Sequence, residues 1–117
     1  MKIDVLGTKY NIRRVKSGQD EYMDKMNFGG YCYSALKQIV ILDLKSVDDY
    51  KNESDEAIKI QENTTLRHEI IHAFLNESGL EWNSNGSNHW AKNEEMVDWI
   101  AIQFPKMQKC FEMAGCL

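Results

Sequence analysis

Residues 65–74 read TLRHEIIHAF and place two histidines, His68 and His72, four positions apart. Residues with this spacing lie on one face of an α-helix, so both imidazoles can reach one metal ion. The opposite face of such a helix is apolar and comprises Leu66, Ile70, Ala73 and Phe74, widened by Ile71 and Leu75. This pattern predicts a mostly buried helix with one polar stripe.

Glu69 follows His68 directly, and it therefore flanks the metal position without having to bind the ion. From there it can take a proton from a metal-bound water. The spacing His-Glu-x-x-His is typical of zinc peptidases, although it also occurs by chance. We therefore predict Zn²⁺ bound by His68 and His72, with Glu69 as the general base. The simpler alternative is a solvated histidine pair.

Signals for both ends of this helix flank the motif. Asn63 or Thr64 can cap its first turn, and Gly79 can end it. Residues 55–61 are rich in charge, and they fit either a helical lead-in or an exposed loop. The helix is expected between the two signals, with its lead-in left open.

Two histidines leave a zinc site incomplete, because catalytic sites use three protein ligands and keep one position open. A second helix is expected to begin at Asn93, a good N-cap, and to run to Phe104. Pro105 either interrupts this helix or opens a last helix through Ala114. Glu94, in the first turn of the second helix, is the expected third ligand.

Asp98 follows Glu94 by one helical turn on the same face. A carboxylate placed there can accept the free N–H of a ligating histidine, which sets the tautomer of the ring and raises its basicity. His89 and Glu95 are the alternatives for the third ligand. Favourable electrostatics at a helix N-terminus explain Glu95 well without a metal, Glu94 in part and Asp98 less well. His89, in the connecting loop, is instead predicted to donate a hydrogen bond to the oxyanion of the reaction.

Strand signals precede the motif. Residues 2–15 alternate in hydrophobicity and predict a β-hairpin with its turn at residues 7–8. A polar loop follows, with a helical turn near residues 20–26. Further strands are expected at residues 31–33 and 38–44, and the apolar run in the second of these indicates a central strand covered on both faces.

The composition is that of an ordinary globular chain. Its 117 residues fit one domain, 43% of them are hydrophobic, 27% are charged, and the net charge is −4. This balance offers no basic stripe for nucleic acid, and no apolar run approaches the length of a membrane span. Three cysteines, Cys32, Cys110 and Cys116, without an export signal favour free thiols in the cytoplasm. The oligomeric state is left open.

The pattern HExxH at residues 68–72, followed by NExxxD at residues 93–98, resembles the gluzincin pattern of zinc peptidases. It is also similar to the small ImmA/IrrE-like metallopeptidases of bacteria, prophages and mobile elements, over residues 64–105. Asp98 stands where Asn is usual in that family. The usual Leu-Leu-Met-Pro ending of the second helix is reduced here to Phe104-Pro105.

The resemblance implies an α+β, minimal zincin-like domain, in which a small, mostly antiparallel sheet packs on two active-site helices plus a C-terminal helix. It implies zinc-dependent hydrolysis of peptide bonds in a regulatory or phage protein, with Asp98 behind His68. A strand beside the site, at residues 31–33 or 38–42, would align an extended peptide substrate by adding it to the sheet. The alternatives are a non-catalytic, zinc-stabilised protein-interaction module and a metal-free helical module. The intact Glu69 argues against a purely structural zinc.

Overall fold

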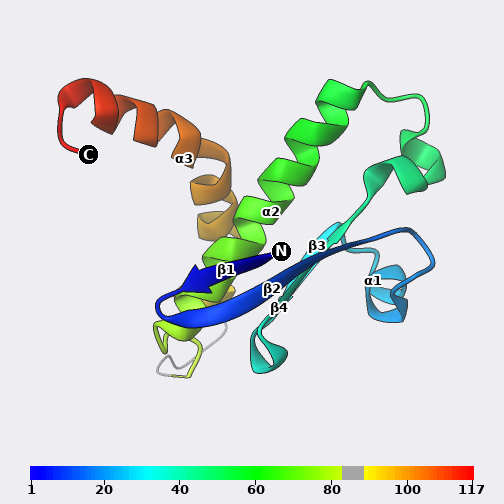
Figure 1. Ribbon diagram of the computed structural model, residues 1–117, viewed down its shortest axis with the longest axis horizontal. Coiled ribbons are helices and arrows are strands. Elements are labelled where there is room, and N and C mark those ends of the chain that lie inside the picture. Colours follow the sequence, from blue (N-terminus) through cyan, green and yellow to red (C-terminus); the bar gives the residue numbers. More distant parts are fainter. Residues whose placement is uncertain (83–88) are drawn as a thin grey trace.

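The computed structural model describes residues 1–82 and 89–117 of the chain (Figure 1). Its strands are β1 (Lys2–Val5), β2 (Thr8–Val15), β3 (Gly30–Tyr33) and β4 (Gln38–Leu42). Its α-helices are α1 (Glu21–Met26), α2 (Asp55–Glu77) and α3 (Glu94–Ala114). Within the described ranges the strands form one sheet in the order β1-β2-β4-β3. The predicted α+β class is confirmed.

The first two strands form the predicted hairpin, but its turn lies one residue earlier than predicted. Leu6 and Gly7 both have positive φ angles, 52° and 87°, which is the conformation that a tight two-residue hairpin turn requires. The N–H of Gly7 also donates to Oδ1 of Asp4 over 2.8 Å. The prediction of a turn at residues 7–8 was therefore wrong, because Thr8 already pairs with Val5.

The sheet is mixed. Strands β1 and β2 are antiparallel, as are β3 and β4, whereas β2 and β4 run parallel. The expectation of a mostly antiparallel sheet therefore holds for the outer pairings and fails for the central one. Strand β4 ends at Leu42 and not at Leu44, because Asp43 caps a 3₁₀ turn at Leu44–Ser46 with its side chain.

Helix α2 includes the lead-in that the sequence left open, and its cap lies earlier than predicted. Ser54 accepts a hydrogen bond from the N–H of Ala57 and caps the first turn, so residues 55–61 are helical. Asn63 and Thr64 lie inside the helix, and the expectation that either caps it was wrong. The predicted end is confirmed, because Gly79 has a φ of 80° and donates to the carbonyl of Asn76 over 3.0 Å.

Helix α3 starts after its predicted cap, Asn93, whose side chain accepts from the N–H of Met96. The helix continues through Pro105 to Ala114, so the separate C-terminal helix expected from the sequence was wrong. Proline fits the φ angle of a helix and removes only one hydrogen bond, so a helix can continue past it with a bend. Figure 1 shows α3 changing direction along its length, away from the sheet.

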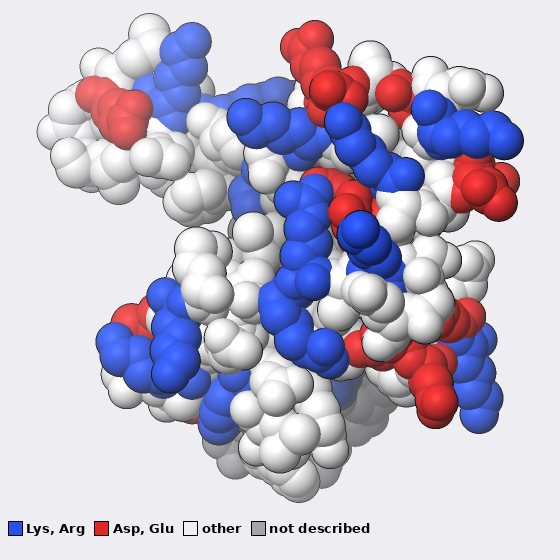
Figure 2. Space-filling model, turned by 45° about the vertical axis from the view of Figure 1, so that its right-hand side comes forward, with Lys and Arg blue, Asp and Glu red and all other residues white. Residues whose placement is uncertain are grey.

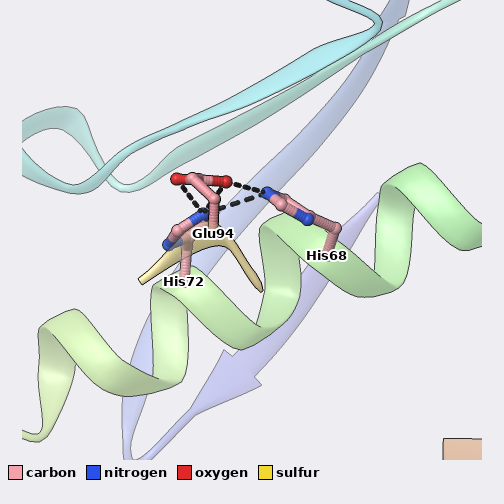
Figure 3. A group of neighbouring side chains, drawn as sticks. All are labelled: His68, His72 and Glu94. Atoms are coloured by element: carbon pink, nitrogen blue, oxygen red, sulfur yellow. Dashed lines mark hydrogen bonds and ion pairs between the residues drawn. The ribbon is translucent and has the colours of Figure 1, made fainter. Parts of the chain in front are cut away.

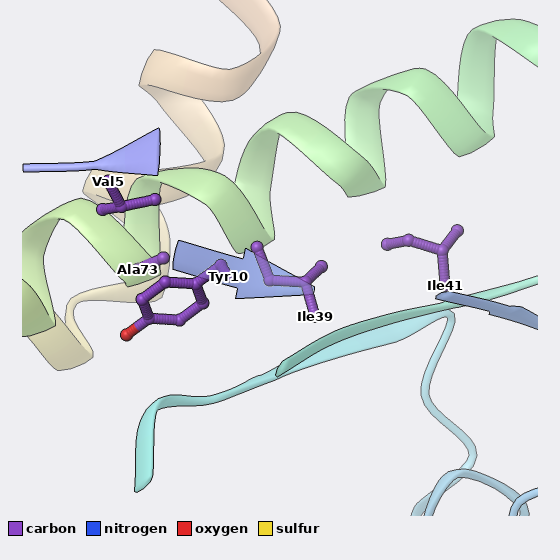
Figure 4. Packing of buried hydrophobic residues seen from close by; sticks show 5 residues of the cluster. All are labelled: Val5, Tyr10, Ile39, Ile41 and Ala73. Atoms are coloured by element: carbon purple, nitrogen blue, oxygen red, sulfur yellow. The ribbon is translucent and has the colours of Figure 1, made fainter. Parts of the chain in front are cut away.

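Both faces of the sheet carry a buried cluster. The face towards α2 contributes Val5, Tyr10, Ile39 and Ile41, which pack with Ala73 of the helix (Figure 4). Because side chains alternate along a strand, Val40 of β4 points the other way and packs with Val15 and Met23. The central, doubly covered position predicted for this strand is thereby confirmed. The expectation that Phe74 belongs to the buried apolar face of α2 was wrong, since this residue is 41% exposed.

Acidic and basic side chains lie next to one another on the face in Figure 2, where Lys and Arg run down the middle. Ion pairs of the described residues include Arg13 with Asp20, Arg14 with Glu62, and Lys45 with Asp55. None of the helices within residues 1–82 and 89–117 combines the length and the apolarity needed to cross a bilayer.

Candidate metal centre

The two histidines of α2 and the first residue of α3 point their side chains at one position (Figure 3). The Nε2 atoms of His68 and His72 are 3.0 Å apart. Glu94 brings one carboxylate oxygen to 3.0 Å from Nε2 of His68 and the other to 3.2 Å from Nε2 of His72. Ligand atoms about 2.1 Å from a tetrahedral zinc ion lie ~3.4 Å from one another. The two nitrogens and the carboxylate therefore fit Zn²⁺ in both donor type and spacing.

The other ring nitrogen of each histidine has a hydrogen-bond acceptor. Nδ1 of His68 lies 2.7 Å from Oδ1 of Asp98, and Nδ1 of His72 lies 3.0 Å from the carbonyl oxygen of Ala91. With its proton on Nδ1, each ring presents the lone pair of Nε2 to the metal position. The structure thus places Asp98 behind His68, where the sequence analysis expected it.

The two histidines are largely shielded, and the carboxylates are not. The side chains of His68 and His72 are 16% and 12% exposed, whereas that of Glu94 is 64% exposed. Burial lowers the pKa of His72, against the opposing influence of Glu94. This imidazole therefore favours the neutral form that binds a metal.

Glu69 is buried beside the ligands, with an exposed fraction of 6%. Burial raises the pKa of its carboxyl to about 7, with a further contribution from Glu94, while His68 and the backbone N–H of Cys32 act in the opposite direction. A carboxyl group with such a pKa can accept and return protons near neutral pH. The structure thus places the predicted general base next to the ligands without making it one of them.

A cavity of about 450 Å³ connects these groups with the edge of the sheet. It is lined by the three candidate ligands and Glu69, by Gly30, Tyr31 and Cys32 of β3, and by Phe28, Asn76 and Lys92. Burial raises the pKa of the Cys32 thiol to about 12, so this group remains protonated and is a poor metal ligand. The metal position and an edge strand therefore share one cleft.

Gly30 allows α2 to lie this close to β3. A Cβ atom at Gly30 would stand 2.8 Å from Cγ2 of Thr65 and 3.1 Å from the carbonyl oxygen of Val40. The residue pattern of the sequence did not indicate this structural role of Gly30. A local pattern carries no signal of this requirement, because the contact joins β3 to a helix far along the chain.

The two alternative ligands lie elsewhere. Among the described residues, the group that could hold a metal ion comprises His68, His72 and Glu94, without His89 or Glu95. His89 is half-buried and precedes the 3₁₀ turn at Trp90–Lys92, and the described lining of the cavity does not include it. Its role as an oxyanion donor stays a prediction.

Lys92 is a cavity residue that sequence reasoning missed. Its Nζ pairs with Oε1 of Glu81 over 2.8 Å, and the residue contributes to the lining of the cavity. The carbonyl of Ala91 was missed as well, since a backbone acceptor leaves no trace in the residue types.

The candidate site rests on the geometry of this chain alone, without support from a known relative. Comparison with family models, with curated proteins and with solved structures returned no match. The likeness to gluzincins and to the ImmA/IrrE-like metallopeptidases therefore rests on the motif residues alone.

Proposed function

We propose that this protein is a zinc-dependent metallopeptidase that hydrolyses peptide bonds. One observation carries the proposal: three convergent ligand atoms, a buried carboxyl group and an edge strand line the same cavity. A histidine pair that was merely solvated would need none of the other groups. The substrate that we propose from the sequence resemblance is a regulatory or phage protein of the cytoplasm.

The residues have separate tasks in this proposal. Zn²⁺ bound by His68, His72 and Glu94 would supply a Lewis acid that lowers the pKa of water and polarises the scissile carbonyl. Glu69 takes the proton of the attacking water on its carboxylate and passes it to the nitrogen of the leaving amine. Asp98 and the carbonyl of Ala91 keep the two imidazoles in the required tautomer and orientation.

Strand β3 positions the peptide. It lies at the edge of the sheet, and an edge strand can pair with an added extended chain. Because Gly30 and Cys32 line the cavity together with Glu69, a peptide paired with β3 would pass the general base. Of the two strands considered from the sequence, β4 lies between β2 and β3, so β3 is the one available for this pairing.

The main alternative is a non-catalytic protein-interaction module that zinc stabilises. In such a module, the buried carboxyl of Glu69 would lower the stability of the fold and serve no function, because burial of an ionisable group opposes folding. A catalytic role explains why this group lies in the cavity with its pKa raised to about 7. We therefore favour the peptidase.

Metal content and peptide cleavage of purified variants test the proposal. We expect His68→Ala, His72→Ala and Glu94→Ala to lose zinc. Glu69→Gln should keep one zinc per chain and lose cleavage of a mixed peptide library by about 10²–10⁴-fold. Glu95→Ala is the matched control, because it removes a neighbouring exposed carboxylate and should behave like the wild type.

Each outcome discriminates between readings. Full zinc in Glu94→Ala would remove Glu94 as a ligand and promote His89 or Glu95. Undiminished cleavage by Glu69→Gln would refute the role of Glu69 as the general base. Stoichiometric zinc in a wild-type protein that cleaves no peptide in the library would favour the interaction module.

A further inference from the structure

We propose that the protein selects substrates by an aromatic side chain, which binds in a second hollow on the α1 side of strand β3. This inference rests on the proposed peptidase function and names a substrate class for the same site. The hollow has a volume of about 500 Å³ and is lined by Tyr22, Tyr31, Cys32 and Tyr33.

The hollow adjoins the metal cleft across strand β3. Tyr31 and Cys32 of β3 line both spaces, one on each side of the edge of the sheet. Phe28, which lines the metal cleft, packs edge-to-face on Tyr22 with ring centroids 6.1 Å apart. A peptide that lies along β3 would therefore contact both spaces at once.

The register of β3 shows which backbone groups would bind that peptide. The N–H of Leu42 donates to the carbonyl of Gly29, so Gly29 and Leu42 form a hydrogen-bonded pair. By the register, Tyr31 and Tyr33 are then the residues of β3 whose N–H and C=O face β4. In an antiparallel pair such residues alternate with residues whose N–H and C=O point away. Gly30 and Cys32 are the outward-facing residues, and both line the metal cleft.

Side chains of an added strand alternate between the two faces of the sheet. On the α2 face they would meet the metal position and Glu69. On the other face they would meet the tyrosines, because Tyr31 packs with the cluster of Val15, Met23 and Val40 on that side. Residues of the substrate next to the one over the metal therefore enter the hollow.

Two of the three tyrosines, Tyr31 and Tyr22, have contacts within the protein that hold them in place before any substrate binds. Tyr31 donates its hydroxyl to Oδ2 of Asp20 over 2.8 Å, and Arg13 pairs with the same oxygen over 3.0 Å. Tyr22 packs edge-to-face on Tyr31, with centroids 5.1 Å apart and an interplanar angle of 84°. A rigid aromatic wall loses little entropy when a ligand binds, so this wall is suited to recognition.

The chemistry of the wall selects the type of side chain. Tyr22 and Tyr33 are 52% and 49% exposed, although they are large aromatic residues. The described lining contains no carboxylate or ammonium group that would pair with a charged substrate residue. Ring faces and edges attract a further aromatic ring, and a methyl group would leave most of the hollow unfilled.

Matched peptides test the inference. We would compare internally quenched peptides that carry Phe or Ala at one scanned position, using the zinc-loaded wild-type protein. At one position and at the position two residues away, we expect kcat/KM for Phe to exceed that for Ala by about 10–100-fold. In Tyr22→Ala this preference should fall to about 3-fold or less, because one wall of the hollow is removed.

Two variants serve as controls. Tyr22→Phe keeps the ring and should keep the preference. Phe111→Ala removes a ring of similar exposure from the distant part of α3 and should leave the preference unchanged. Thermal melting of each variant verifies that it is folded.

Binding of the same peptides to the Glu69→Gln protein, measured by calorimetry with zinc and with chelator, gives a readout that does not need cleavage. Equal kcat/KM for Phe and Ala at every position, or an undiminished preference in Tyr22→Ala, would overturn the inference. Tight binding of Phe peptides that Tyr22→Ala abolishes, without any cleavage by the wild type, would support the hollow and refute the peptidase. Equal binding of both peptides without cleavage would refute both.

Discussion

Arg67 of α2 donates its Nε–H to the main-chain oxygen of Ala101 in α3 over 2.6 Å. Ala101 lies four residues before Pro105, which has no N–H to offer to that oxygen. A second nitrogen of the same guanidinium donates to Oγ1 of Thr64 on its own helix over 3.0 Å. Helix α2 thus supplies the hydrogen bond that the proline removes, and the bond joins the two helices that carry the candidate ligands.

Arg67→Met should destabilise the protein. The exchange leaves the carbonyl of the buried Ala101 without this donor, and loss of a charged donor to such a group costs about 1.5–3 kcal/mol. Urea unfolding of the metal-free protein measures the change. Lys59→Met, at an exposed position of the same helix, should change stability by less than about 0.5 kcal/mol.

Pro105→Ala provides the second arm of the cycle, because alanine offers an N–H to the same carbonyl. The double variant should therefore lose less stability than Arg67→Met alone. Strict additivity of the two single exchanges would show that Arg67 does not substitute for the missing helical hydrogen bond.

Asp98→Ala should fold and still bind zinc, but with an affinity about 10–100-fold lower, because Nδ1 of His68 loses its acceptor. Competition with a chelator of known affinity measures this. Asp98→Asn keeps an oxygen acceptor without the charge, so its zinc affinity should lie between those of the wild type and Asp98→Ala. Wild-type affinity in Asp98→Ala would mean that the carboxylate is a solvated residue of α3 only.

Gly30→Ala should destabilise the protein by about 1–3 kcal/mol, because the added methyl group overpacks the contact between β3 and α2. Gly29→Ala is the matched control, since a Cβ there would meet nothing nearer than 3.9 Å. Thr65→Ser removes the methyl group that lies 2.8 Å from the new Cβ and should restore part of the lost stability. Equal stability of Gly29→Ala and Gly30→Ala would contradict the close approach.

Glu77 should give the protein a pH-dependent stability. Its carboxylate accepts from the hydroxyls of Thr8 and Tyr10 over 2.9 and 2.8 Å and pairs with Lys37, and these donors lower its pKa, with Lys37 first. The folded state therefore binds the proton more weakly than the unfolded state, whose carboxyl titrates near ~4.3. The stabilisation is full above that pH and is lost as the pH falls through the folded pKa.

Denaturant unfolding between pH 7 and pH 3 measures this effect. Glu77→Gln should flatten the fall in the free energy of unfolding below about pH 4.3, where the wild-type carboxylate is protonated on unfolding. Glu56→Gln, at an exposed position of the same helix, serves as the control. An unchanged acid limb in Glu77→Gln would mean that its three donors do not favour the ionised form.

Local patterns predicted much of the candidate site. The spacing of His68 and His72 requires only helical periodicity, and the spacing of Glu94 and Asp98 follows the same rule. The side-chain acceptor of Asn93 and the positive φ of Gly79 are equally local, so the start of α3 and the end of α2 were predicted correctly. Chemistry that depends on one turn of helix can be inferred from residue types.

Features that depend on distant contacts were missed. Helix α2 is capped by Ser54, well before the motif. The residue types alone do not decide which of several possible capping residues starts the helix. The exposure of Phe74 and the burial of Glu69 depend on where the sheet lies against the helix. The hydrogen bond to the carbonyl that Pro105 leaves without its helical donor comes from Arg67, which belongs to another element.

The parallel pairing of β2 with β4 joins residues 11–15 to residues 38–42, whereas the other pairings join strands that are adjacent in the chain. Closing the longer loop costs more conformational entropy and slows folding. The two antiparallel units can therefore form first and dock afterwards. Since α2 packs on Val5 and Tyr10 of one unit and on Ile39 and Ile41 of the other, it acquires its support only when they meet. We therefore expect the arrangement of the candidate ligands to form late in folding, because neither unit alone supports α2.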